Sequence, residues 1–231
     1  MKTRLLIIVI IGLLALALSA CQSPAPLPVP PTPIATLIPA TLPPPGEPTP
    51  IPGMESVVFP VSAPSQAAGK AVYDANCANC HGADGTGVVE NARDFNDVDY
   101  MRAAAPVAFF QSITNGKETM PAFADSLSDG DRWNVTYYLW HWSVPQEQLD
   151  QGQPVYDANC VSCHGPDGQG AIPQAAKFSP EFISKSPPSQ YYESVSGGKG
   201  IMPPWQDRLS EEERWAAIEY SRAFAYEPLG Q

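Results

Sequence analysis

Basic residues are scarce in this sequence of 231 residues. Lysine and arginine number 13 against 24 aspartates and glutamates, which gives a formal net charge of −11 with histidine neutral. A protein that binds nucleic acid needs a basic face to neutralise the phosphates, so the composition excludes this class. An acidic chain of this kind is expected to dock on basic partners.

No apolar run is long enough to cross a bilayer. The longest, from Leu5 to Leu18, has 14 residues. As a helix it would span about 21 Å, which falls short of the roughly 30 Å of bilayer hydrocarbon. Two basic residues before this run and small residues after it are typical of an export signal. We therefore predict a signal peptide at residues 1–20.

The end of this signal, Leu18-Ser-Ala-Cys21, resembles a lipoprotein signal. The resemblance implies cleavage before Cys21 and attachment of lipid to that cysteine. An uncleaved membrane anchor is the alternative. In either case the protein is tethered to a membrane, and its folded part lies on the periplasmic or extracytoplasmic side.

Charge and hydrophobic periodicity are almost absent from residues 22–64, where 15 of the 27 prolines lie. Proline fixes φ and removes a hydrogen-bond donor, so residues 21–64 are predicted to form an extended, polyproline-like linker rather than a packed domain. At roughly 3.1 Å per residue this linker could reach about 130 Å.

Cysteine is also rare, and four of the five cysteines occur in two C-x-x-C-H motifs. The motifs consist of Cys77, Cys80 and His81, and of Cys160, Cys163 and His164. C-x-x-C alone is compatible with a zinc half-site, a redox dithiol or a disulfide. A structural zinc centre needs four ligands, whereas each motif offers three. A thioredoxin-type dithiol needs a βαβ setting, which the sequence does not show.

The two motifs belong to an internal repeat, which is the first feature to establish in any sequence. Residues 73–87, YDANCANCHGADGTG, align with residues 156–170, YDANCVSCHGPDGQG, at an offset of 83. A later block that starts at Gly116 aligns with one that starts at Gly198 at an offset of 82. One residue is therefore missing between the blocks in the second copy. The repeat predicts two duplicated domains, at residues 65–145 and 146–231.

Both domains are predicted to be helical, because no strand pattern of useful length occurs. Helices are expected at Gly69–Cys80 and Leu149–Cys163, at Pro106–Thr114 and Pro188–Ser196, and after the capping residues Ser128 and Ser210. The predicted fold class is all-α. A domain of about 80 residues with this much glycine has too little apolar side chain for a stable core, so something else must fill it.

C-x-x-C-H is the attachment motif for c-type haem. Cysteines three residues apart on a helical turn point to the same side, where each thiol can bond one haem vinyl group as a thioether. The histidine that follows is then placed over the iron. The sequence therefore predicts two covalently attached haem c groups, one on each motif.

With these motifs the chain resembles tandem class I cytochromes c, from residue 67 to about residue 226. In that family a methionine some forty residues after the histidine, often in Met-Pro near a glycine, is the sixth iron ligand. The resemblance implies Met120 in NGKETMPAF and Met202 in GGKGIMPPW as these ligands. Met101 is the alternative in the first domain, but no methionine occupies its repeat position. His/Met ligation raises the haem potential.

The resemblance has further implications for the surroundings of the haem. Gly69 and Gly152, together with Tyr73 and Tyr156, would lie where the first helix of each domain packs on the last helix, whose aromatic residues are Trp133 and Trp215. The histidine's second ring nitrogen needs an acceptor, and the carbonyl of Ile172, before a proline, is expected to serve in the second domain. The first domain has no proline at that place. His141 lacks a C-x-x-C partner, so a packing role is expected for it.

Two axial ligands from the protein leave no open position on the iron for a substrate. The predicted function is therefore outer-sphere electron transfer and not catalysis: a membrane-tethered dihaem carrier in a respiratory or photosynthetic chain. Its expected partners are redox proteins such as a quinol-oxidising complex and a terminal oxidase. Two alternatives remain open, namely a peroxidase-like dihaem enzyme and a fixed cytochrome subunit of a larger oxidoreductase complex.

Overall fold

The computed structural model describes residues 57–229. The predicted signal peptide, Cys21 and most of the proline-rich linker lie outside these residues. The chain divides into two units after Thr49, and the described residues all belong to the unit Pro50–Gln231. Between residues 57 and 229 the structure contains helices and three isolated β-bridges but no sheet. No helix in this range is long and apolar enough to cross a membrane.

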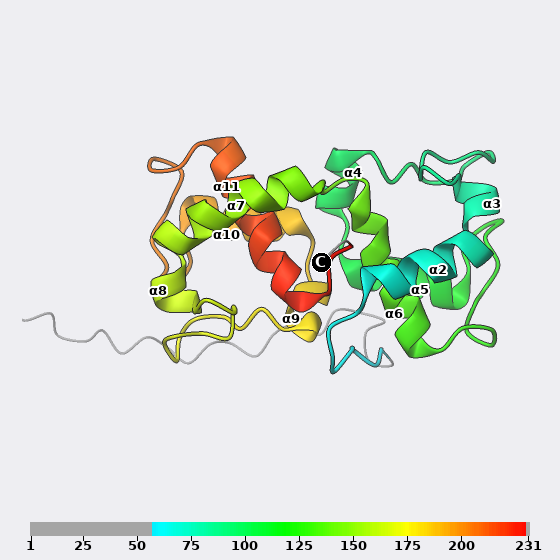
Figure 1. Cartoon of the computed structure of the whole chain (residues 1–231), viewed down its shortest axis with the longest axis horizontal. Helices are drawn as coiled ribbons and strands as arrows, with labels where there is room; N and C mark the ends of the chain where they lie inside the picture. The colour runs from blue at the N-terminus through cyan, green and yellow to red at the C-terminus, as the bar shows by residue number, and fades with distance from the viewer. Residues whose placement is uncertain (1–56, 230–231) are drawn as a thin grey trace, which may run out of the picture. The chain divides into compact units, whose positions relative to one another are not determined.

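The same order of helices occurs twice along the chain (Figure 1). The first half contains α2 (Gln66–Asn76), α3 (Ala78–His81), α4 (Val98–Ala103), α5 (Pro106–Asn115), α6 (Asp129–Tyr138) and the 3-10 turn η1 (Leu139–His141). The second half contains α7 (Gln146–Asn159), α8 (Val161–His164), α9 (Pro180–Ser184), α10 (Pro188–Gly197), α11 (Glu211–Arg222) and the 3-10 turn η2 (Ala223–Ala225). The sequence repeat is therefore a structural repeat, and the predicted all-α class is confirmed.

Serine caps begin the last long helix of each half, as predicted. Ser210 accepts the N–H of Glu213, and the Glu213 carboxylate accepts the backbone N–H of Ser210, which completes a capping box. Ser128 accepts the N–H of Asp131 in the same way, and its hydroxyl donates to the Asp131 carboxylate. Side-chain caps of this kind satisfy N–H groups that have no partner within the helix.

The first helix of each half was predicted to run through the whole C-x-x-C motif, and this prediction is wrong in detail. The helix ends at the first cysteine of each motif, Cys77 or Cys160, where φ is −115°. A new short helix begins one residue later and carries the second cysteine and the histidine. A change of φ at one residue does not alter the hydrophobic periodicity of the sequence, so the sequence could not show that the helix ends there.

The residue missing from the second half can now be located. Phe95 and Phe178 occupy equivalent places at an offset of 83, because each donates its N–H to a glycine carbonyl of the loop after the motif. The caps of α4 and α9, Asp97 and Ser179, are equivalent at an offset of 82. Asn96 therefore has no counterpart, and its side chain donates to the carbonyl of Asp84 in the first half.

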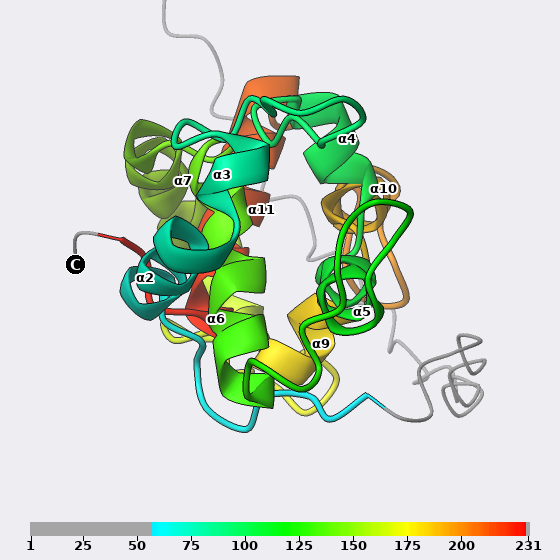
Figure 2. The same cartoon turned by 90° about the vertical axis from the view of Figure 1, so that its right-hand side faces the viewer.

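In each half the first helix lies directly against the last, α2 on α6 and α7 on α11 (Figures 1 and 2). The contact is so close that a Cβ added at Gly69 would lie 2.1 Å from the carbonyl oxygen of Asn134, and one at Gly152 the same distance from that of Ala216. Glycine is thus required at both crossings, as the resemblance implied. Tyr73 and Tyr156 lie at the crossings as expected, but their partners on the last helices are tyrosines and not Trp133 and Trp215.

Tyr73 packs on Tyr138 in the first half, with ring centroids 5.4 Å apart, and Tyr156 on Tyr220 in the second, at 5.5 Å. The tryptophans of the last helices face away from the crossing. Trp133 stacks on Phe110 at 4.2 Å, and Trp215 stacks on Tyr192 at 4.4 Å. Both pairs occupy equivalent positions in the repeat.

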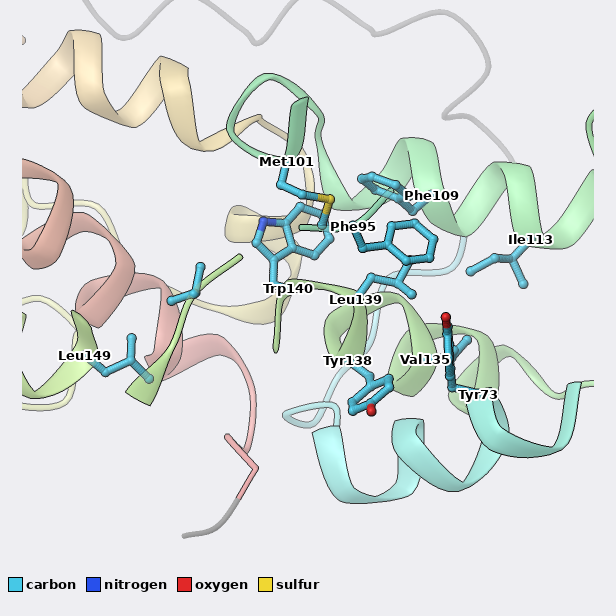
Figure 3. Packing of buried hydrophobic residues seen from close by; sticks show 11 residues of the cluster. Tyr73, Phe95, Met101, Phe109, Ile113, Val135, Tyr138, Leu139, Trp140 and Leu149 are labelled. Carbon is cyan, nitrogen blue, oxygen red and sulfur yellow. The ribbon is translucent and has the colours of Figure 1, made fainter. Parts of the chain in front are cut away.

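Two apolar clusters hold the described residues together. The first belongs mainly to the first half and surrounds Trp140, towards which the side chain of Met101 points (Figure 3). The second joins the halves and consists of Val107, Phe110, Trp133, Tyr137, Ile183, Ala225 and Tyr226. The core therefore continues from one half into the other.

The joint between the halves has an internal two-fold character. Helix α4 packs on α10, and reciprocally α9, the counterpart of α4, packs on α5, the counterpart of α10. Arg222 lies over the ring of Trp140, the residue at its own repeat position, at 5.3 Å from the ring centroid. Arg222 also pairs with Glu219, and both side chains are only 2 % exposed. Such self-complementary contacts are those of an isologous interface, formed here between two halves of one chain.

The ends of the two halves also meet. The N–H of Glu227 donates to the carbonyl of Pro64 at 2.8 Å, and the N–H of Gln66 donates to the carbonyl of Glu227 at 3.0 Å. Ser65 and Glu227 form a parallel bridge. The last segment of the second half is therefore bonded to the first segment of the first half.

We expect the substitution Gly152→Ala to lower the free energy of unfolding by at least about 2 kcal/mol, because the new methyl group must displace the backbone of α11. The matched control is Gly130→Ala, where the nearest atom is 3.7 Å from the added Cβ. That variant should unfold like the parent or be more stable by up to about 1 kcal/mol. Denaturant titration followed by circular dichroism measures both. Equal stability of the two variants would show that the helices are not in close contact.

Candidate haem sites

Both attachment motifs have the same local geometry. The first cysteine caps one helix, and the second cysteine and the histidine lie in the next, shorter helix. The backbone angles of Cys77 and Cys160 agree within two degrees, although the residues between the cysteines differ. All four thiols are free. Burial, followed by the neighbouring thiol, raises the pKa of Cys77 to about 11, and the same causes raise that of Cys160 to about 11.

A glycine-rich loop follows each motif and is hydrogen-bonded to a tyrosine of the first helix. The hydroxyl of Tyr73 donates to the carbonyl of Gly82 at 2.7 Å, and Tyr156 makes the same bond with Gly165. Gly82 and Gly165 both have a φ of 80°, a conformation that glycine adopts without strain. The buried tyrosine, part of the glycine crossing, therefore also fixes the turn that follows the histidine.

A backbone carbonyl orients each histidine, but it is not the one expected from the sequence. Nδ1 of His81 lies 3.4 Å from the carbonyl oxygen of Arg93, and Nδ1 of His164 lies 3.3 Å from that of Ala176. Both carbonyls come twelve residues after the histidine, in the part of the loop that returns towards it. Ile172 lies earlier in the loop, where its N–H donates to the carbonyl of Cys163. A histidine that donates from Nδ1 presents Nε2 to a metal.

A phenylalanine stacks on each histidine, and sequence reasoning missed it. The ring of Phe95 lies 5.0 Å from that of His81, and the ring of Phe178 lies 4.8 Å from that of His164. Each phenylalanine follows its histidine by 14 residues, a match between the repeats that could have been noticed. Burial lowers the pKa of His81, partly offset by its bond to the Arg93 carbonyl, which favours the neutral imidazole that metal binding needs.

The predicted methionines lie in two matching loops. Lys117 and Met120 exchange backbone hydrogen bonds of 3.1 and 2.9 Å, and the corresponding pair in the second half exchanges two of 3.0 Å. A Cβ at Gly116 would lie 2.7 Å from the carbonyl oxygen of Met120, and one at Gly198 would lie 2.8 Å from that of Met202. Glycine is therefore needed for the loop to close on its methionine.

The packing of the methionines distinguishes the two candidates of the first half. Met101 is 1 % exposed within the first apolar cluster, and Ile183 at its repeat position is equally buried. Met120 is only half-buried, and it packs on the same cluster as Cys77. Met101 thus has the position of a core residue, whereas Met120 and the motif cysteine Cys77 are both partly buried and pack against this core.

These donor sets fit a haem c at each motif. Two free thiols, an imidazole held through Nδ1 and a thioether on a fixed loop are the groups that such a haem requires. Among residues 57–229 no group of three or more histidine, cysteine, aspartate or glutamate side chains could hold a bare metal ion. Lys117 and Lys199 are exposed beside the methionine loops.

His141 lies apart from both motifs. Its ring stacks on Tyr138, with centroids 5.6 Å apart, and also contacts Trp142. Burial, followed by the positive charge of Lys70, lowers its pKa. The position is one of packing, at the end of the last helix of the first half.

Comparison with known proteins identifies the family of this chain. Residues 64–139 and 147–220 each match the sequence model of the family described as cytochrome c oxidase, cbb3-type, subunit III. The chain belongs to this family. Each matched stretch contains one C-x-x-C-H motif and one of the two methionine loops, so the chain consists of two tandem cytochrome c-type domains.

Two curated relatives illustrate the similarity. The cbb3-type cytochrome c oxidase subunit FixP of Azorhizobium caulinodans is 30% identical over 162 residues, which are 63% of this chain and 55% of the relative. The subunit CcoP of Rubrivivax gelatinosus is 29% identical over 157 residues, 64% of this chain and 51% of the relative. The chain thus spans a little over half the length of the curated relatives it matches. Among solved structures, cytochrome c6 of the diatom Phaeodactylum tricornutum aligns with 34% of this chain and 94% of its own, at 28% identity and a TM-score of 0.31.

The identity of the sixth ligand can be tested by comparing two methionines. In haem-loaded protein, Met120→Leu should abolish the long-wavelength charge-transfer band of one ferric haem and lower its potential by on the order of 0.1 V, because the thioether is lost. Met101→Leu, which preserves side-chain volume in the core, should leave band and potential unchanged. A redox titration followed by visible spectroscopy measures both. The opposite pattern would make Met101 the ligand.

Proposed function

We propose that this chain is a dihaem c-type cytochrome that passes electrons by outer-sphere transfer to a terminal oxidase of which it forms a subunit. One observation carries the proposal: the two family-matched stretches hold the same donor set in the same backbone geometry. Bound haem would supply an iron that alternates between the ferric and ferrous states. The proposed domain boundaries are residues 65–145 and 146–231.

The residues have separate roles in this proposal. The two cysteines of each motif would hold the porphyrin covalently, so that an exported protein does not lose it. His81 and His164 would bind the iron through Nε2, because Nδ1 faces a backbone carbonyl. Met120 and Met202 would each supply a second protein ligand. Two protein ligands would leave no position on the metal for a substrate, which favours a carrier over a peroxidase-like enzyme.

The partner follows from the relatives, whose names describe them as subunits of cbb3-type cytochrome c oxidases. This favours a fixed subunit over a free shuttle, with a quinol-oxidising complex or a carrier reduced by it as the source of electrons. The proposed location is the extracytoplasmic side of a membrane. Lipid on Cys21 and the linker of residues 21–64 would provide the tether.

Haem content can be counted by removing one motif at a time. We expect Cys77→Ser with Cys80→Ser to remove one covalently bound haem and leave the second, and Cys160→Ser with Cys163→Ser to do the same in the other half. The reason is that each thioether bond needs a cysteine thiol, and the double variant has no thiol left in that motif. Mass spectrometry of protein matured in a host competent for c-type haem attachment measures the loss. A parent protein with one haem or none would refute the dihaem assignment.

A fixed subunit should remain with its oxidase. After extraction of native membranes in mild detergent, we expect the full-length chain to copurify with oxidase activity in a constant ratio through two chromatographic steps. A Cys21→Ser variant should still copurify if protein contacts hold the subunit, although lipid attachment is lost. Separation of the wild-type cytochrome from the oxidase at the first step would instead indicate a free carrier.

A further inference from the structure

Trp133 in the first half is covered by the segment that precedes α2. Its ring stacks on Phe110 on one side and on Phe59 on the other, with centroids 4.2 and 5.8 Å away. Its indole N–H donates to the carbonyl oxygen of Val58 at 2.8 Å. An extended stretch of chain, residues 57–61, thus satisfies the polar group of a buried tryptophan and covers its ring.

Trp215 is the counterpart in the second half, and no extended segment covers it. The chain that precedes α7 is the short link of residues 142–145, whose Val144 is packed in the first apolar cluster. Trp215 keeps the equivalent stacking partner, Tyr192. Its indole N–H has no acceptor among residues 57–229, although the residue is only 9 % exposed.

A cavity of about 450 Å³ opens beside this indole. Its lining includes Trp215, three glutamates (Glu147, Glu211 and Glu212) and Arg102 from the first half, and we name it the Trp215 seat. The Arg102 guanidinium lies 3.8 Å from the centroid of the Trp215 ring, whose π face attracts a cation. Three glutamates against one arginine leave the seat negatively charged.

Two of the three negative charges are particular to the second half. The positions equivalent to Glu147 and Glu212 are Pro64 and Gly130, whereas Glu211 corresponds to Asp129, which is paired with Arg132 in the first half. The Trp215 seat is therefore more acidic than the Trp133 surface. The first half accepts an apolar segment with Phe59, and the second half is suited to a segment with a cationic side chain. The chain's own linker cannot supply one, because no lysine or arginine occurs between Arg4 and Lys70.

We propose that the Trp215 seat binds an extended basic segment of a partner polypeptide. A backbone carbonyl of that segment accepts the indole N–H, as Val58 does for Trp133. A lysine or arginine side chain lies among Glu147, Glu211 and Glu212. An anionic membrane surface does not suit this site, because its charge has the same sign. The proposal concerns a protein contact and does not depend on bound haem.

The probe is the heptapeptide Lys-Val-Val-Lys-Pro-Val-Lys, which is the sequence of residues 57–61 with lysine in place of Phe59 and a lysine at each end. The control peptide has glutamate in place of each lysine. Titration of the full-length, haem-loaded protein by calorimetry should give saturable binding of the lysine peptide with a dissociation constant below about 1 mM. The glutamate peptide should not bind.

Two double variants distinguish binding at the seat from attraction to the general negative charge of the protein, and a third variant tests the indole N–H. E211Q with E212Q should weaken binding about fivefold to tenfold, because two ion pairs are lost. E90Q with E193Q, which removes two charges from exposed glutamates outside the cavity, should change affinity less than twofold. Trp215→Phe keeps a ring but removes the N–H, and should weaken binding about threefold or more. Circular dichroism melting shows that each variant is folded.

Three results would overturn the proposal. One is the absence of saturable binding, and another is an equal loss of affinity in both double variants, which would reveal only nonspecific attraction. The third is self-association of the protein that E211Q with E212Q abolishes, because a second copy would then occupy the seat. If E211Q with E212Q does not fold, Trp215→Phe decides. A failure here leaves the haem content, measured by mass, unaffected.

Discussion

The glycine crossing between the first and last helix of each half is the constraint from which the rest of the structure follows. With no side chain at Gly69 or Gly152, the backbones come within van der Waals contact, and this closeness brings a buried tyrosine against the last helix. The same tyrosine hydroxyl fixes the loop after the motif histidine. Helix packing and ligand geometry are therefore coupled through one residue in each half.

Much of this could be predicted because it repeats. The helices, the serine caps, the glycines of the crossing and the two-domain plan all leave matching residues at an offset of 83 or 82. The cysteines, histidines and methionines of the candidate sites were identified in the same way. Their assignment as ligands remains a prediction, although the burial of Met101 in the core favours Met120.

The contacts that the sequence did not reveal are made where the loop after each motif folds back onto the histidine. The acceptor of His164 is the carbonyl of Ala176, and a carbonyl belongs to every residue, so no residue type marks it. Phe178 also lies on the returning arm and stacks on the histidine. The end of helix α2 at Cys77 depends on one backbone angle, which no residue type in the sequence indicates. The acidic lining of the Trp215 seat combines Arg102 of one half with glutamates of the other, and only tertiary structure brings them together.

The bridge between Ser65 and Glu227 has a mechanical consequence. A pull transmitted along the residues before Pro64 would act where the first segment of one half is bonded to the last segment of the other. The force would therefore act on both halves at once and would not unfold helix α2 alone.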